Sequence, residues 1–288
     1  MRFRWDWLRP VVTAPFVPTI GPVHPSVLTE DVFADTLAAA ASDRFLRYDK
    51  DIRWSDAKDE TVLVEDVIHQ PGETLIPTLS RRGSGTVKVH VYGVRPDTLL
   101  VASELAEKLC AAQGAAKARV VRFLGPEAPQ GRGTRIQLKD FRTQTCAAPT
   151  GPVRRYTEWP TPIQRDFASF AERMAADGFR FLYGRMRAGT VGAVLVAASQ
   201  GKVAGAIGPM EIRPDAIGSR QLMPQYFGVL PEHRGKGLGR LLWRAAMHWG
   251  QTHGAAYQLL QTEVGGASDR LCQAEGLTSL GFTYSRPA

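Results

Sequence analysis

The alternation of apolar and polar positions is clearest in the second half of the chain. Over residues 238–249 the apolar residues Leu238, Leu241, Leu242, Ala245, Ala246 and Trp249 recur at a helical spacing. This spacing of i, i+3, i+4 and i+7 predicts an amphipathic helix. An apolar run precedes the helix at 224–230 and another follows Gly254 at 256–264, and both runs predict strands.

The earlier part of this half continues the same kind of pattern. Residues 153–159 predict a strand, and the segment 161–174 places Phe167, Phe170, Ala171 and Met174 on one helix face. Two further strands, 192–199 and 202–212, are joined by a Gln-Gly turn. Strands and helices in this order predict an α/β fold in layers.

Weaker patterns in the first half predict a second α/β unit. Residues 86–92 alternate as a half-buried strand does, and a helix at 99–112 and a strand at 118–124 follow. We therefore divide the chain into an extended N-terminal segment (1–22), an N-terminal α/β domain (23–142), a linker (143–152) and a second domain (153–288). The linker is polar and ends in Pro-Thr-Gly-Pro.

Composition narrows the class of protein. The chain has 44% hydrophobic and 22% charged residues, as ordinary globular proteins do. No run approaches the roughly 18 apolar residues of a membrane span, and the N-terminus lacks a clean signal peptide. Three scattered cysteines without a CxxC motif fit a reducing compartment. These features predict a cytoplasmic protein with no membrane partner.

The net charge is +8, and the excess of basic residues is larger in the second half. A positive field suits nucleic acid or a polyanionic small molecule. The chain has no basic run or recognition helix, so we expect no nucleic-acid partner. His248 and His253 lie five positions apart, on different helix faces, and we expect no metal site.

The stretch VLPEHRGKGLGRLL, residues 229–242, joins the strand at 224–230 to the helix at 238–249. A Walker loop needs Ser or Thr after its lysine, but Gly237 follows Lys236. The dinucleotide fingerprint needs GxGxxG, whereas Gly235, Gly237 and Gly239 form GxGxG. Neither nucleotide-binding loop matches this stretch.

The stretch instead resembles the pyrophosphate loop of the GNAT acyltransferase superfamily, V-x-P-x-x-R-G-x-G-x-G. It matches without a gap through Val229, Pro231, Arg234, Gly235, Gly237 and Gly239. Residues 153–288 also follow the order of elements of that superfamily. The resemblance implies a mixed sheet flanked by helices, and it implies acetyl-CoA as the co-substrate, with no metal.

Physical chemistry agrees with a phosphate-binding loop. Glycines let backbone amides approach phosphate oxygens, and a helix N-terminus favours an anion. By resemblance, backbone amides near the end of the first strand face the thioester, and the pantetheine arm lies between that strand and the one that ends near Glu263. The predicted coenzyme A-binding residues are Phe227, Gly228, Val229, Arg234, Gly235, Lys236, Gly237, Leu238, Gly239 and Arg240. Gly228 suits a bulge or a close backbone approach.

Members of this superfamily usually end with LYxxxGF, whose tyrosine protonates the leaving sulfur. In this chain LCQAEGL places Cys272 at the tyrosine position, and the alternative alignment LTSLGF places Leu277 there. We prefer the first alignment, and the tyrosine is absent in both. Tyr284 aligns in neither. Cys272 either donates the proton or packs as a small buried residue.

For the catalytic base, Glu263 at the end of its strand is the best carboxylate candidate. Glu211 and Tyr226 are reserves, and an ordered water is an alternative to any side chain. We expect His233, at a variable position of the loop, to be exposed.

The two halves share a short similarity. YGVRPD at 92–97 parallels FGVLPE at 227–232, and QGAAKARVV at 113–121 parallels HGAAYQLLQ at 253–261. One hypothesis is that the first domain is a degenerate GNAT copy without the phosphate loop, and the other is a chance similarity of one strand–helix–strand unit.

The resemblance thus predicts an N-acetyltransferase that moves an acetyl group from acetyl-CoA to a primary amine of a small molecule by direct attack. The alternative function is a non-catalytic acyl-CoA-binding or regulatory protein. The acceptor is not predicted, since acceptor pockets are built from variable loops. Neither the acyl length nor the oligomeric state is predicted.

Overall fold

The computed structural model describes residues 4–42, 44–93, 95, 97–128 and 133–288. The chain forms two compact units, one of Met1–Leu138 with Leu259–Ala288 and one of Lys139–Gln258. The predicted boundary between domains lay in a linker at 143–152, and residues 259–288 were expected with the second domain. They join the first unit instead, because the last strand is hydrogen-bonded to strands of that unit.

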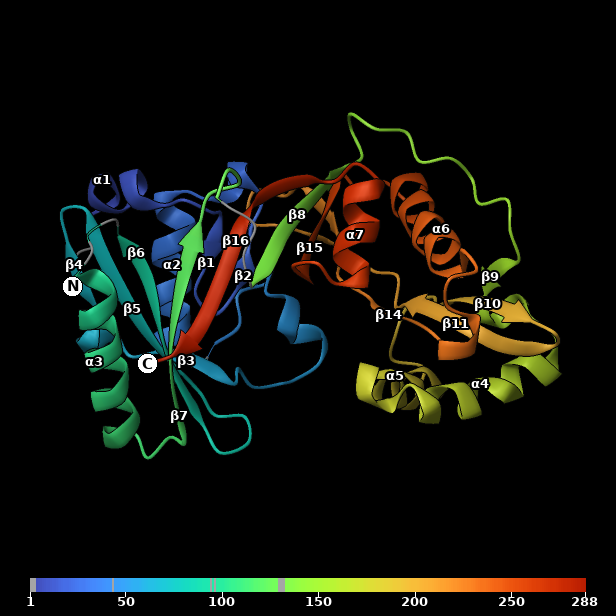
Figure 1. Ribbon diagram of the computed structural model, residues 1–288, viewed down its shortest axis with the longest axis horizontal. Helices are drawn as coiled ribbons and strands as arrows, with labels where there is room; N and C mark the ends of the chain where they lie inside the picture. The colour runs from blue at the N-terminus through green and yellow to red at the C-terminus, as the bar shows by residue number, and fades with distance from the viewer. Residues whose placement is uncertain (1–3, 43, 94, 96, 129–132) are drawn as a thin grey trace. The chain divides into compact units, whose positions relative to one another are not determined.

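The first unit contains a mixed sheet (Figure 1). Its strands are β3 (Glu60–Val62), β4 (Ile68–Gln70), β5 (Glu73–Ser80), β6 (Thr86–Gly93), β7 (Lys117–Leu124), β8 (Thr134–Asp140), β15 (Tyr257–Glu263) and β16 (Thr278–Pro287). They run in the order β15-β8-β16-β7-β6-β5-β3, and β4 pairs with β5. β8 and β15 pass through the division between the units. The helices of this unit are α1 (Trp5–Leu8), α2 (Glu30–Ala41), α3 (Thr98–Ala112) and α7 (Ala267–Ala274).

The N-terminal segment differs from its prediction. Residues 1–22 were expected to be extended, but α1 is followed by a 3-10 turn at Arg9–Val11. A two-stranded ribbon of β1 (Phe16–Val17) and β2 (Gly21–Pro22) then completes the segment. Leu8 and Val11 are buried, so the packing of apolar side chains accounts for the turn of helix.

The predicted strand–helix–strand unit of the first half is present as β6, α3 and β7. Valines of β6 and β7 pack against small residues of α3 on one face of the sheet; this core contains Leu75, Val89, Val91, Ala102, Ala106 and Val120. β6 and β7 are parallel and hydrogen-bonded from Thr86 and Lys117 to Val91 and Arg122. The two strands therefore stay paired over most of their length. The hypothesis that the first domain is a degenerate GNAT copy stays a prediction.

An aromatic cluster covers the opposite side of β6 and surrounds a buried histidine. Tyr92 stacks on Phe123, and Phe16 stacks on His90. His90 is only 3% exposed, and its ring lies within hydrogen-bonding distance of the Ile76 carbonyl. Burial lowers the pKa of His90 to about 4, against the opposing effect of Glu60.

This histidine makes stability depend on pH. The unfolded chain binds a proton at His90 below about pH 6.5 and the folded chain does so only near pH 4, so stability falls as the pH falls through this window. We expect a loss of about 3 kcal/mol at pH 4 relative to pH 7 from this group. Urea unfolding at both pH values measures the loss, and it should shrink in His90→Gln. An equal pH dependence in the variant would contradict the assignment.

The second unit carries a smaller antiparallel sheet with helices on both faces (Figure 1). Its order is β14 (Tyr226–Val229), β11 (Lys202–Gly208), β10 (Leu195–Ser199) and β9 (Val153–Arg155). A hairpin of β12 (Ile212–Pro214) and β13 (Arg220–Leu222) pairs with the start of β15. α4 (Thr161–Arg173) and α5 (Phe179–Arg187) lie on one face of the smaller sheet, and α6 (Leu238–Thr252) lies on the other.

The apolar face predicted at 161–174 is buried under this sheet. Phe167, Phe170 and Met174 pack with Phe179 and Leu182 of α5, and all five are at most 3% exposed. On the other face, Leu242 and Ala246 of α6 are buried as the helical spacing predicts. The sandwiched sheet holds β14 in place, and the glycine-rich loop begins where β14 ends.

Candidate functional site

β14 is an edge strand in the part of the chain that the structure describes, because it pairs only with β11. The Leu230 N–H donates to the Ala204 carbonyl at 2.9 Å, on the β11 side. Backbone groups of successive strand residues point to opposite edges, so those of Phe227 and Val229 point away from β11. The Arg234 guanidinium confirms this direction, because its Nε donates to the Val229 carbonyl at 3.0 Å.

Gly228 has a packing reason to be glycine. A Cβ at this position would lie 2.7 Å from Met174 Cε and 2.8 Å from Phe179 Cε2, on the side of α4 and α5. The neighbours of Gly228 are thus side chains of α4 and α5, and the close backbone approach proposed for it stays a prediction. The pairing of β14 with β11 runs without a register shift from Tyr226 to Val229, so the bulge considered for Gly228 is not in this strand.

The loop after β14 leaves a helix N-terminus open. A 3-10 turn at Pro231–His233 leads to Gly235 and Gly237, whose φ angles are 74° and 80°. These positive φ angles favour glycine, and among the described residues no atom beyond the adjacent residues lies within 4 Å of a Cβ placed at either position. Gly237 caps α6 without a side-chain hydrogen bond. The first N–H groups of α6 are therefore available to an anion.

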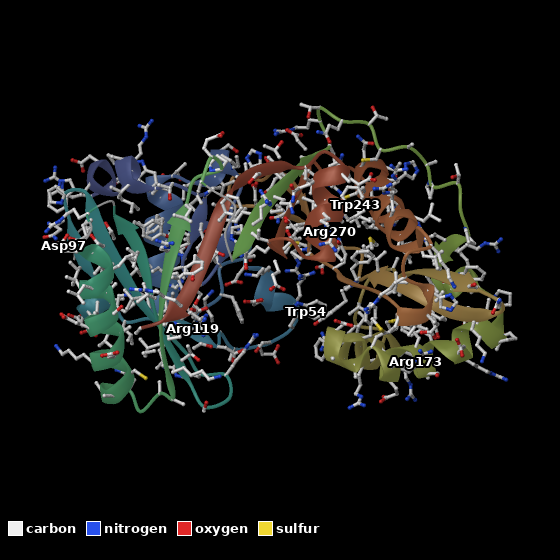
Figure 2. The ribbon with its side chains drawn as sticks, viewed as in Figure 1. Trp54, Asp97, Arg119, Arg173, Trp243 and Arg270 are labelled. Atoms are coloured by element: carbon white, nitrogen blue, oxygen red, sulfur yellow. The ribbon has the colours of Figure 1, made fainter. Side chains whose placement is uncertain are left out.

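Basic side chains surround this helix end. Arg234, Lys236 and Arg240 are exposed, while Leu238 and Gly239 are half-buried. His233 is half-buried too, which differs from the expectation of exposure. An ion pair at 2.7 Å joins Glu232 of the loop to Arg173 at the end of α4, labelled in Figure 2. The sequence did not indicate this contact, since the two residues are far apart in the chain.

The chain leaves one strand partner for another at a fork, which we define as residues 222–226 and 257–258. β13 pairs in parallel with β15 through Gln221 with Tyr257 and Leu222 with Gln258. Met223, Pro224 and Gln225 then carry the chain to β14, which joins β11 instead. One run of chain thus changes partner within three residues, and among the described residues no strand pairs with the outward edge of β14.

Glu263, the predicted base, is exposed at the end of β15, in the first unit. Its carbonyl accepts the Gly266 N–H at 2.9 Å. Of the reserves, Glu211 forms an ion pair with Arg213, and the Tyr226 ring packs near Phe179. The role of Glu263 as a base stays a prediction.

Cys272 lies in α7 and is 2% exposed. Gly276 follows the C-cap residue Glu275 of this helix and Gly281 lies in β16, and the choice between the two alignments stays a prediction. Burial, with Asp269 and Glu275 nearby, raises the pKa of the Cys272 thiol to about 12. Such a thiol is a poor proton donor at neutral pH, so the packing alternative fits better.

If packing is the role of Cys272, Cys272→Ala should leave the pH profile of turnover unchanged. We expect a loss of only about 1 kcal/mol in the free energy of unfolding, from the small cavity that the substitution creates. Steady-state kinetics between pH 6 and 9 measures the profile, and urea unfolding measures the stability. A basic limb of the profile that moves in the variant would return Cys272 to the mechanism.

Comparison with known proteins finds a family match for part of the chain. Residues 154–272 match the family model of the acetyltransferase (GNAT) family. No curated protein matches. Among solved structures, a GCN5-related N-acetyltransferase from Sphaerobacter thermophilus is 14% identical with a TM-score of 0.46. The alignment covers 76% of this chain and 82% of that chain.

Two further solved structures show similar values. A GCN5-related N-acetyltransferase from Kribbella flavida is 14% identical (TM-score 0.45; 78% of this chain, 90% of that chain). A tandem GNAT protein from the clavulanic acid biosynthesis pathway is 13% identical (TM-score 0.45; 88% of this chain, 93% of that chain).

The chain therefore has a mixed α/β fold whose large mixed sheet is flanked by helices, as predicted. Residues 154–272 carry a GNAT acetyltransferase domain, which confirms the family suggested by the loop. Proteins of this family are acyltransferases and generally use acetyl-CoA. In the described part of the chain, no helix is long and apolar enough to span a membrane. The same residues contain no group of three or more His, Cys, Asp or Glu side chains that suits a metal ion.

Proposed function

We propose that this protein transfers an acyl group from a coenzyme A thioester to a primary amine of a small molecule. Acetyl-CoA is the donor to test first, since the family generally uses it. The observation that carries the proposal is the open N-terminus of α6, where Gly235 and Gly237 leave room for an anion. The pyrophosphate of coenzyme A matches this site in charge and in its need for backbone N–H groups.

Basic residues of the loop give the proposed site its charge. Arg234, Lys236 and Arg240 add positive side chains beside the helix end. The bond from Arg234 to the Val229 carbonyl holds one guanidinium between the strand and the loop. Charge-assisted hydrogen bonds to phosphate are the strong kind, so the loop is the proposed source of most of the affinity.

The outward edge of β14 is the proposed track for the pantetheine arm. The arm is joined to the pyrophosphate, so an arm that follows this edge runs back from Val229 toward Tyr226. Its amides can pair with the outward backbone groups of Phe227 and with the Val229 N–H, as an added strand pairs with a sheet edge, while the Val229 carbonyl already accepts from Arg234. The thioester then lies at the fork, where the outward N–H groups can polarise its carbonyl.

The proposed reaction is a direct attack. The amine nitrogen forms a bond to the acyl carbon, the carbon–sulfur bond breaks, and the sulfur leaves as a thiolate. A base removes one proton from the nitrogen; Glu263 is the proposed base, with ordered water as the alternative. The thiolate takes its proton from solvent after it leaves, because Cys272 is buried in α7 and its thiol has a raised pKa.

One observation favours a second candidate function. The residue at the position of the family's proton donor is a buried cysteine. A non-catalytic protein that binds acyl-CoA for regulation needs no proton donor there.

One experiment separates the two functions. Coenzyme A binding is titrated by calorimetry, and free thiol release from acetyl-CoA is followed across a panel of amino sugars, amino acids and other small amines. Binding together with thiol release on at least one amine supports the transferase. Binding without release on any amine favours the regulatory protein, and absence of binding rejects both.

A further inference from the structure

Two buried polar atoms near the fork have no hydrogen-bond partner in the part of the chain that the structure describes. They are Nε1 of Trp243, a donor, and Oε1 of Gln258, an acceptor. Trp243 is 4% exposed and Gln258 is fully buried. An unpaired buried polar group costs free energy, so each of these two atoms points to a group outside the chain that pairs with it.

The orientation of the Gln258 amide is set by its neighbours. Gln225 Nε2 donates to the Met223 carbonyl, which leaves Gln225 Oε1 to face Gln258. Gln258 Nε2 donates to that oxygen at 2.8 Å. Swapping the nitrogen and oxygen of either amide would break this chain of bonds, so the unpaired atom of Gln258 is the oxygen.

Both side chains lie on the face of the sheet that α6 covers. Gln258 pairs with Leu222, whose side chain is packed so closely on Gly250 of α6 that a Cβ there would lie 2.6 Å from Leu222 Cδ2. Directly paired residues share a face, so Gln258 also faces α6.

Trp243, labelled in Figure 2, lies on α6 between Gly239 and Gly250. These two glycines contact the strands on either side of the fork. Gly239, about one turn before it, adjoins Phe227 of β14, and Gly250, about two turns after it, adjoins Leu222 of β13. Trp243 therefore faces the region where the chain leaves β13 for β14.

The distance from Lys139 to the Trp243 ring is a second indication of where the indole ring lies. The bonds from Phe141 N–H to the Ala256 carbonyl and from Val264 N–H to the Gly133 carbonyl set an antiparallel register of β8 and β15. In that register Lys139 lies opposite Gln258, on the same face. Lys139 Nζ is 5.8 Å from the centre of the Trp243 ring. Trp243 and Gln258 thus approach the fork from the helix and from the sheet.

We infer that Trp243 and Gln258 bind the hydroxyl of a short hydroxyacyl group at the thioester end of the donor. A hydroxyl is the smallest group that both accepts, here from Trp243 Nε1, and donates, here to Gln258 Oε1. This inference rests on the proposed function, in which the arm follows β14 from the loop and brings its acyl end to the fork. It narrows the range of acyl groups that the protein is proposed to transfer, and acetyl-CoA is then a weaker donor than the hydroxyacyl thioester.

Other acyl groups fit these two atoms less well. A methyl group leaves the donor and the acceptor unpaired. A carboxylate accepts from Trp243 but meets the Gln258 oxygen, which is also an acceptor. Sites that bind a substrate hydroxyl discriminate strongly against the analogue that lacks it, because the buried partners stay unpaired.

The test compares matched donors on the intact protein. Hydroxyacetyl-CoA is measured against acetyl-CoA, and 3-hydroxybutyryl-CoA against butyryl-CoA, by thiol release with one amine. We expect kcat/KM to favour the hydroxylated member of at least one pair by about tenfold or more. Equal values in both pairs would overturn the inference and point to a buried water between the two side chains. A preference for malonyl-CoA over all four donors would also overturn it.

Two variants locate the effect. Trp243→Phe keeps a ring and removes the donor, and Gln258→Met keeps the length and removes the acceptor; each should bring the preference close to onefold while coenzyme A binding persists. Trp249→Phe is the matched control, because Trp249 is also on α6 with an unpaired Nε1. A preference that survives both substitutions would refute the inference. The ratio in the unaltered protein decides the matter if a variant does not fold, and failure of coenzyme A itself to bind would instead reject the proposed function.

Discussion

Gly237→Glu should weaken coenzyme A binding by about 100-fold or more. Gly237 caps α6 at a φ of 80°, with no atom within 4 Å of a Cβ placed there. The open space is the proposed place of the pyrophosphate, so a carboxylate there would occupy it. Two like charges about 4 Å apart near a protein surface repel by about 4 kcal/mol, which is more than a 100-fold change in affinity. Isothermal calorimetry with coenzyme A measures the loss.

Gly218→Glu is the matched control for this charge and for the backbone strain. Gly218 has a φ of 84° and equally open space around its Cβ position, but it lies in the turn between β12 and β13. The control should bind coenzyme A as the unaltered protein does, and both variants should lose similar stability because each forces a side chain into the left-handed region. Unchanged affinity in Gly237→Glu would remove the loop from the donor site.

The parts of the site that the sequence predicted are those set by neighbouring residues. The motif from Val229 to Gly239 is contiguous, so its strand, loop and helix could be recognised without knowledge of the fold. The helix predicted over 238–249 is α6, which ends at Thr252, and the strand predicted over 256–264 is β15. Local periodicity and turn chemistry were sufficient for these elements.

The features that the sequence did not predict depend on contacts between distant residues. β16 joins the first unit because Phe282 pairs with Leu124 and Arg135, and no local pattern reports that pairing. The fork, likewise, arises because Leu222 pairs with β15 while Tyr226 pairs with β11. Gln258 is the second residue of β15, and the sequence did not predict that its amide makes a polar contact.

Burial also corrected the weight of one catalytic candidate. Alignment with the family's tyrosine position made Cys272 a candidate proton donor. An alignment does not predict whether a side chain is exposed. Apolar packing around the last helix buries the thiol and raises its pKa, which removes the reason to prefer it as an acid. Glu263, by contrast, is exposed at the end of β15, and its role as a base stays a prediction.

α7 is tied to the first unit by a buried carboxylate, Asp269, which is 1% exposed. It accepts from Arg135 Nε at 2.8 Å and from the Gly265 N–H at 2.9 Å. Thr262 of β15 donates to it at 3.1 Å, so one side chain connects β8, β15 and α7. Burial alone would raise the pKa of Asp269, but the Gly265 N–H and the Arg135 guanidinium outweigh it and hold the pKa below its usual range.

Asp269→Ala should therefore lower the free energy of unfolding by about 3–5 kcal/mol, because it leaves the Arg135 charge buried without its partner. Urea unfolding at pH 7 measures the loss, and Asp97→Ala, which removes an exposed ion pair with Arg95, should have little effect.

The pH dependence tests the cause of this loss. Since the folded pKa of Asp269 is lowered, its ionised form stabilises the protein above the unfolded pKa of about 3.9, and this stability is lost as the pH falls through the folded value. The difference between the unaltered protein and Asp269→Asn should accordingly shrink below about pH 4. A difference that stays constant down to pH 2 would show that packing of the side chain, and not its charge, holds α7 in place.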